Sequence, residues 1–213
     1  MCPASSPGKA LRTLYQLKPY ERRRKPLTVK YRAVRVWLAG ASLRKTARAL
    51  AADCRFSHEA VRQWARRLVP LLRPRPKRHR RIVIDETSIF LRNRKEVFGR
   101  AALDGDPKEP IFTWVTDGRS GLDALVFLKN VLRRIEGTAF FMVDRGVWYP
   151  WALDTLGLSW KVQKGGPRNH VECFFGSFKW RLRSMRRRPG TWHTMQSIQH
   201  ILAAHAHHWH ESR

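Results

Sequence analysis

The 213-residue chain is poor in acidic residues: 16 Asp and Glu stand against 43 Lys and Arg, and the formal net charge is +27 at pH 7. Cysteines are few as well. Cys2, Cys54 and Cys173 show no paired spacing, which argues against a disulfide framework and against a zinc ribbon. No apolar run reaches the roughly 18 residues that a membrane helix needs, and the first residues lack the hydrophobic segment of a secretory signal. We therefore expect a cytoplasmic protein that has no membrane partner.

The positive charge is the strongest signal in the composition. Of the basic residues, 22 lie in residues 1–80, where only 3 acidic residues occur. Lys and Arg side chains that neutralise phosphates release condensed counterions, so a nucleic acid is the expected partner of such a chain. A protein of the membrane surface would instead concentrate its charge on one amphipathic helix. We expect double-stranded DNA as the partner and a nucleoid-associated location.

The pattern along the chain predicts four parts. Residues 1–27 are rich in Pro, Ser, Lys and Arg without apolar periodicity, and we expect a basic flexible arm. Residues 28–69 predict three short helices, an arrangement typical of a helix-turn-helix DNA-binding domain. Residues 70–80 contain three prolines among basic residues and predict a semi-extended linker. Residues 81–213 form the fourth part.

The predicted helix-turn-helix region offers several side chains to DNA. Thr28, Ser42 and Ser57 are candidate N-caps of its three helices. A recognition helix presents its N-terminal residues to base edges in the major groove, and nonspecific phosphate contact is the alternative role for the same side chains. The candidate DNA-binding residues of this region are Arg44, Lys45, His58, Arg62, Gln63 and Arg66, with Glu59 among the side chains that face the same way.

Residues 81–213 mix short apolar runs with helical patterns. Three successive strands, then helices alternating with strands, indicate an α/β domain. The predicted strands are 81–92, 96–103, 110–116, 138–144 and 158–163, and the predicted helices are 122–135, 148–156, 168–187 and 191–209.

Three carboxylates of this region stand out. Asp85 follows the apolar run "IVI" and Asp144 follows "AFFMV", so both are expected on, or at the tip of, buried strands. Glu172 is expected on a helix, at the edge of its apolar stripe and beside Gly176. A buried carboxylate is costly unless it is paired or coordinated, and hard oxygen ligands suit Mg²⁺ or Mn²⁺. The alternative is that the two aspartates only end strands or pair with nearby arginines.

Five segments together resemble a known family. In chain order they are "SLRKTARAL", "SHEAVRQWARRL", "VIDET", "VDRGVWYPWAL" and "RNHVECFFGSFKWRLR". The set is similar to the DDE-type transposases of insertion sequences, especially the insertion sequence 6 family, over roughly residues 28–205. The resemblance implies a ribonuclease H-like catalytic domain, which is a mixed sheet flanked by helices, after a small all-α helix-turn-helix domain.

The same resemblance implies the active site. Asp85, Asp144 and Glu172 would be the catalytic triad and the ligands of two Mg²⁺ or Mn²⁺ ions. The interval between the second and third acids is 172 − 144 = 28 positions, which is shorter than is usual in that family. Four residues flank the triad and are candidates for holding DNA phosphates, with simple solvated charge as the alternative: Arg145, Arg168, Asn169 and Lys179.

The implied function is that of a DNA transposase, which binds insertion-sequence ends and catalyses metal-dependent strand cleavage and strand transfer. Two alternatives stay open. One is a noncatalytic DNA-binding protein derived from a transposase, and the other is a metal-dependent DNA nuclease or resolvase. Because two element ends must be brought together, we expect a homo-oligomer, with a dimer as its form.

Further residues have a plainer expected role beside a functional one. Glu86 should point to the opposite sheet face from Asp85, as a structural group or an additional ligand. Trp148 and Trp151 follow Asp144 closely, and could stack on a flipped or frayed base or pack in the core. The histidines near the C-terminus fit a partly exposed helix better than a metal site: His200, His205, His207, His208 and His210.

Overall fold

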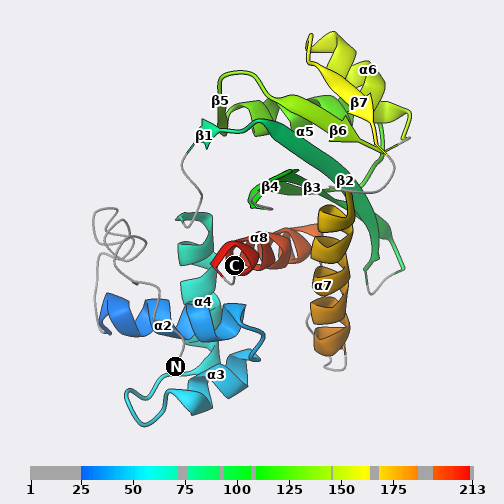
Figure 1. Cartoon of the computed structure of the whole chain (residues 1–213). Helices are drawn as coiled ribbons and strands as arrows, with labels where there is room; N and C mark the ends of the chain where they lie inside the picture. The colour runs from blue at the N-terminus through cyan, green and yellow to red at the C-terminus, as the bar shows by residue number, and fades with distance from the viewer. Residues whose placement is uncertain are drawn as a thin grey trace. The chain divides into compact units, whose positions relative to one another are not determined.

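The chain divides into two compact units, residues 1–73 and residues 74–213 (Figure 1). The computed structural model describes residues 25–71, 76–91, 94–106, 109–144, 146–163, 168–186 and 194–211. The predicted basic arm therefore lies outside the described residues, apart from positions 25–27. No helix in the described ranges combines the length and the apolar character needed to span a membrane.

Residues 25–71, the described part of the first unit, contain three helices followed by a short 3-10 turn. They are α2 (Leu27–Leu38), α3 (Leu43–Ala49), α4 (His58–Leu68) and η1 (Val69–Leu71). Two of the predicted N-caps are confirmed, because the hydroxyls of Ser42 and Ser57 accept hydrogen bonds at 3.1 Å from the backbone N–H groups of Lys45 and Ala60. Thr28 is not a cap. The helix begins at Leu27, before Thr28, and its N-cap is Pro26, whose fixed φ suits the start of a helix.

The three helices share one apolar core. Its buried members include Leu27, Tyr31, Val34, Leu38, Leu50, Val61, Trp64, Ala65 and Leu68. In α4 this burial follows the predicted apolar stripe from Val61 to Leu68. The predicted DNA-binding side chains of α3 and α4 are exposed: Arg44, Lys45, His58, Arg62, Gln63 and Arg66.

A five-stranded mixed sheet forms the centre of the second unit. Its strands lie in the order β4-β3-β2-β6-β7, and β3 runs antiparallel to both of its neighbours while β6 and β7 run parallel to β2. The bounds are β2 (Arg81–Phe90), β3 (Glu96–Asp104), β4 (Pro110–Thr116), β6 (Phe140–Val143) and β7 (Trp160–Val162). With its flanking helices, this mixed sheet confirms the predicted α/β fold class, a mixed sheet flanked by helices.

Helices cover both faces of the sheet (Figure 1). Side chains alternate along β2, so that Val83 joins the core on one face and Ile82 and Ile84 join the core on the other. The Val83 face packs against α7 (Arg168–Arg186) and α8 (Met195–Glu211). The opposite face packs against α5 (Gly121–Leu132) and α6 (Trp148–Thr155).

The end of the predicted linker belongs to the second unit. Lys77–Arg78 form a short strand, β1, which pairs in parallel with β5 (Ile135–Glu136). His79 is buried and contacts the carboxylate of Asp104, while Lys77 and Arg81 form ion pairs with Glu109 and Asp106. A linker running through residue 80 is therefore wrong at its C-terminal end. The apolar pattern did not predict this contact, because charged side chains make most of it.

Candidate active site

Asp85 lies in the middle of β2, and Asp144 directly follows β6, the parallel neighbour of β2. The parallel register of β2 and β6 pairs Arg81 with Phe140 and Val83 with Met142. The pairing ends at Val83 and Met142; continued by two positions, the same register would place Asp85 beside Asp144, which lies 59 positions further along the chain (144 − 85).

Both aspartates follow the alternation that turns toward α7. Val83 and Met142, two positions before them, belong to the core that α7 and α8 cover. Asp85 is buried within β2, and its Oδ1 accepts a hydrogen bond at 2.8 Å from the backbone N–H of Glu86. Asp144 directly follows β6 and is half-buried, and its Oδ1 accepts from the backbone N–H of Gly146 at 2.9 Å. Backbone groups thus orient both carboxylates.

Gly146 is required at this bend. A Cβ atom at this position would lie 2.8 Å from the Trp148 ring and 3.0 Å from Asp144 Oδ1. The chain can therefore turn from β6 into α6 beside the aspartate only without a side chain here.

Glu172 lies in the first part of α7, which packs against β2 (Figure 1). Its neighbour Val171 is fully buried in the core that contains Val83 and Met142, whereas Glu172 itself is exposed. Gly176, one turn onward, leaves open space, because a Cβ there would meet no atom within 4 Å. The accessible carboxylate that the sequence predicts is confirmed.

The donor set fits a divalent cation only in part. Within the described ranges, no group of three or more His, Cys, Asp and Glu side chains is close enough together to hold a metal ion. The pair of Asp85 and Asp144 nevertheless suits Mg²⁺, which typically binds one or two carboxylates and takes its remaining ligands from water and substrate phosphates. Glu172 as a third ligand stays a prediction.

Glu86 belongs to a buried charge cluster on the other face of the sheet. Its side chain is 1% exposed, and it stands directly opposite Arg100 in the antiparallel register of β2 and β3. Glu86 Oε2 lies 3.6 Å from Arg100 Nη1, and Glu86 Oε1 accepts a hydrogen bond at 2.5 Å from Arg119 Nε. The predicted orientation away from Asp85 is confirmed, with Glu86 in a structural role.

Tyr149 of α6 completes this cluster. Its hydroxyl donates to Glu86 Oε2 at 3.5 Å, and its ring centroid lies 5.5 Å from the Arg100 guanidinium carbon. Burial raises the pKa of Tyr149 far above the usual value, and the nearby Glu86 adds to the effect while Arg100 opposes it. The phenol therefore stays protonated and serves as a hydrogen-bond donor.

No family model matches this sequence. A curated relative, the uncharacterized protein MJ0017 of Methanocaldococcus jannaschii, is 34% identical over 172 residues, which is 80% of this chain and 80% of the relative. The chain belongs to the family of that archaeal protein.

Several solved structures have a related arrangement of elements. A chain of the simian T-cell lymphotropic virus intasome, in complex with PP2A regulatory subunit B56 gamma, is 12% identical to this chain, with a TM-score of 0.49. The match covers 73% of this chain and 63% of the intasome chain, which is less than two thirds of the latter. The catalytic core domain of BIV integrase is 13% identical with a TM-score of 0.43, over 57% and 80% of the two chains. The catalytic domain of Mos1 mariner transposase is 14% identical with a TM-score of 0.35, over 89% and 92%. All three TM-scores lie below 0.5, which is a weak resemblance.

In this MJ0017-family chain, the predicted phosphate-binding residues near the triad have different surroundings. Asn169 is exposed and Lys179 is half-buried, both on α7. Arg145 lies outside the described residues, and so does the side chain of Arg168. The candidates on α3 and α4 belong to the other unit.

Arg119 is a residue that the sequence did not single out. It lies between β4 and α5, and its guanidinium carbon is 4.7 Å from the Trp148 ring centroid and 4.9 Å from that of Phe98. Its bond to Glu86 spans 33 positions of the chain, so no local pattern predicts it. The run of Trp148 and Trp151 after Asp144 was the one available signal, because exposed aromatic rings attract arginine side chains.

Proposed function

We propose that this protein is a DNA transposase, of the DDE type and similar to the insertion sequence 6 family, that cleaves and joins DNA strands. The observation that supports the proposal is the parallel register of β2 and β6, which, continued two positions beyond the pair of Val83 and Met142, would place Asp85 beside Asp144 on the face of the sheet that α7 covers. Two such carboxylates, one within β2 and one just after β6, are costly in a folded chain unless they are paired or coordinated. Glu172, exposed in the first part of the same helix, is the proposed third acid.

The chemistry is a pair of phosphoryl transfers. In the first, a water oxygen attacks phosphorus at the element end, the bond from phosphorus to the 3′ oxygen breaks, and this oxygen leaves as a hydroxyl with a proton from the water. In the second, that 3′-hydroxyl attacks a phosphodiester of the target, whose own 3′ oxygen leaves. A bound Mg²⁺ or Mn²⁺ pair supplies the positive charge that such reactions need. The carboxylates of Asp85, Asp144 and Glu172 would hold the ions.

The first unit is proposed to bind the element ends. Ser57 caps α4, and the side chains of His58, Arg62, Gln63 and Arg66 on this helix are exposed, as those of a recognition helix must be. A chain with a net charge of +27 supplies the sequence-independent attraction to phosphates. Two ends must meet for joining, which favours a homodimer as the working form.

The test is an Asp85→Asn variant and a duplex made from the DNA that flanks the gene. We expect wild-type protein to nick this duplex in Mg²⁺, and we expect the variant to bind it with equal affinity and to lose at least 100-fold in nicking rate. Asp117→Asn is the matched control, since Asp117 is an exposed turn aspartate that pairs with Lys95 at 3.4 Å. It should cleave like the wild type.

The outcomes separate the candidate functions. Cleavage retained by Asp85→Asn removes this residue from the site. Binding without cleavage by the wild type supports the noncatalytic DNA-binding alternative, which the lack of a three-ligand group among the described residues also favours. Cleavage without joining of the 3′ end to a second duplex supports a nuclease or resolvase.

A further inference from the structure

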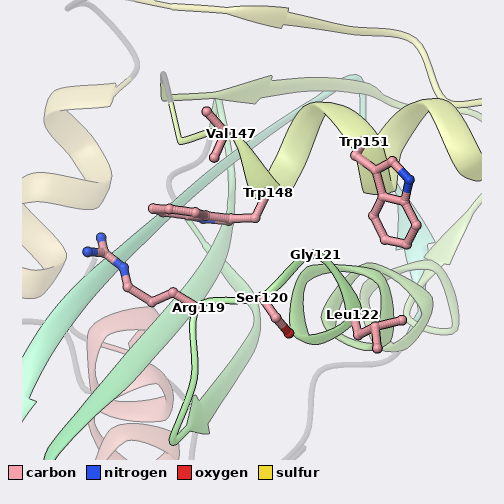
Figure 2. Close-up of a pocket in the computed structure, with 7 residues that line it drawn as sticks. All are labelled: Arg119, Ser120, Gly121, Leu122, Val147, Trp148 and Trp151. Carbon is pink, nitrogen blue, oxygen red and sulfur yellow. The ribbon is translucent and has the colours of Figure 1, made fainter.

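An open pocket of about 440 Å³ lies between the starts of α5 and α6 (Figure 2). Its lining comes from two segments: Arg119, Ser120, Gly121 and Leu122 before and at the start of α5, and Val147, Trp148 and Trp151 at the start of α6. The second segment begins three residues after Asp144. β4 runs parallel to β2, because each is antiparallel to β3, so the segments that follow β4 and β6 leave the sheet at the same end, and α5 and α6 then cover the face opposite to the one toward which Asp85 and Asp144 are turned.

Large apolar side chains stand exposed around this pocket. Trp151 is 49% exposed, Leu122 66% and Val147 79%. Figure 2 shows Trp148 and Trp151 projecting from α6 toward the segment that leads into α5. Exposed apolar side chains are usually scattered singly over a protein surface. A cluster of them, as here, is typical of a binding site.

The pocket is built rather than incidental. Glu86, buried beneath it, accepts the hydrogen bond from Arg119 and so fixes this guanidinium between the Phe98 and Trp148 rings. The Trp151 ring packs so closely on Gly121 that a Cβ there would lie 2.7 Å from the ring. Both aromatic walls are therefore held by the fold before any ligand binds.

An occupant must match a flat aromatic wall with a cation beside it. The Arg119 side chain is 44% exposed while it lies on Trp148, so it offers positive charge at the rim of an apolar cavity. A planar ring joined to a phosphate has this complementary shape and charge, and a DNA strand supplies both. A second copy of the chain is a poor match, because it carries the same net charge of +27.

We propose that the pocket binds one unstacked nucleobase of the DNA strand, with Trp151 and Trp148 against the base and Arg119 near its phosphate. This inference rests on the proposed function, since it requires DNA at this edge of the sheet. Taking a base out of the duplex costs free energy, which base-to-aromatic stacking offsets. The pocket would then hold the strand at the end of the sheet where β6 leads into α6, three residues after Asp144, and it would favour DNA whose end frays easily.

The test compares two single-stranded oligonucleotides in binding to the full chain. One carries a single 2-aminopurine among thymines, and the other carries an abasic site at that position. We expect the wild type to quench the 2-aminopurine fluorescence and to bind the base-containing strand about tenfold more tightly than the abasic one. Trp151→Ala should lose both the quenching and the preference, with unchanged affinity for the abasic strand.

Two further variants make the result specific. Trp180→Ala is the matched control, because Trp180 is 70% exposed on α7 and does not line the pocket; it should behave like the wild type. Leu122→Glu places a carboxylate at the rim and should abolish the preference while circular dichroism shows an intact fold. An equal loss of affinity for both strands in Trp151→Ala, or the same loss in Trp180→Ala, overturns the proposal.

Sedimentation of the same variants detects the other occupant. If Trp151→Ala changes the oligomeric state and leaves the base preference intact, the pocket is an interface between copies and the nucleobase site is refuted. If the wild type binds neither oligonucleotide nor the flanking duplex, both the nucleobase site and the proposed function are refuted. Duplex binding without base preference overturns the pocket alone.

Discussion

Val83 and Met142 pair across β2 and β6, and the same register, continued by two positions, would place Asp85 beside Asp144, whose carboxylates are oriented by the N–H groups of Glu86 and Gly146. Two like charges at neighbouring positions would repel each other and lower the stability of the metal-free protein. The same repulsion is relieved by a divalent cation. Stability and ion binding should therefore change in opposite directions when one of the two charges is removed.

The variant Asp144→Asn tests this relation without any DNA. We expect it to melt at a higher temperature than the wild type in a chelator, and to lose the rise in melting temperature that Mg²⁺ or Mn²⁺ gives the wild type. Thermal unfolding with and without the ion measures both. Asp154→Asn is the control, because Asp154 accepts a hydrogen bond from Trp160 and lies away from the site. Ion-dependent stabilisation of Asp144→Asn as large as in the wild type would remove Asp144 from the ligands.

Glu86→Gln is expected to destabilise the second unit by about 3 kcal/mol, because it leaves the fully buried Arg100 without its cross-strand carboxylate. Urea unfolding followed by circular dichroism measures the change. Glu96→Gln, an exposed position of β3, is the matched control and should change the free energy of unfolding by less than about 0.5 kcal/mol. Equal effects in the two variants would mean that the Glu86 charge does not compensate Arg100.

Apolar patterning predicts most of this fold. β2, β3 and β4 lie within about two residues of their expected bounds, since each strand forms one short, mostly apolar run in the sequence. β1 and β5 escape prediction because Lys77, Arg78 and Glu136 contribute charge rather than apolar surface. β2 also continues past Asp85 to Phe90, because Glu86 finds its partner on the neighbouring strand.

The candidate site shows the same division. Asp85 and Asp144 could be identified because an acid that ends an apolar run is costly. Their adjacency follows only from the parallel register, and the role of Arg119 follows only from a partner 33 positions away. Local sequence patterns therefore identify candidate site residues, whereas the pairing of distant segments determines which of them lie close together.

Glu59 shields one of the proposed DNA-binding arginines. Its carboxylate accepts a hydrogen bond from Arg62 Nε at 3.1 Å, and this bond lowers the pKa of Glu59. Glu59→Gln should raise the affinity for random duplex DNA about threefold, because it removes a negative charge that faces phosphates and releases Arg62. Fluorescence anisotropy at fixed salt measures the affinity. Asp53→Asn also removes one negative charge, from the ion pair of Asp53 with Arg32, and should raise the affinity less. An equal rise in affinity in the two variants would mean that net charge alone causes both effects.

We expect the contact of His205 on α8 with α7 to weaken at acid pH. Its ring is buried beside Phe174, and Nε2 lies 3.2 Å from the Phe174 carbonyl oxygen, so the neutral ring donates through Nε2. Burial lowers the pKa of His205 to about 4, and the charges of Arg181 and His208 act in the same direction. In the unfolded chain the pKa is about 6.5. Below that value the unfolded state binds a proton that the folded state does not.

The stabilising contribution of the neutral ring is therefore complete above pH 6.5 and is lost as the pH falls toward 4, by about 3 kcal/mol in all. His205→Leu should flatten this part of the dependence, whatever its effect at pH 7. Free energies of unfolding from urea titrations at pH 7 and pH 5 measure the slope for each protein. His200→Leu is the matched control, because His200 lies on the same helix at a half-exposed position and should keep the wild-type slope. A slope unchanged in His205→Leu would show that other groups cause the acid sensitivity.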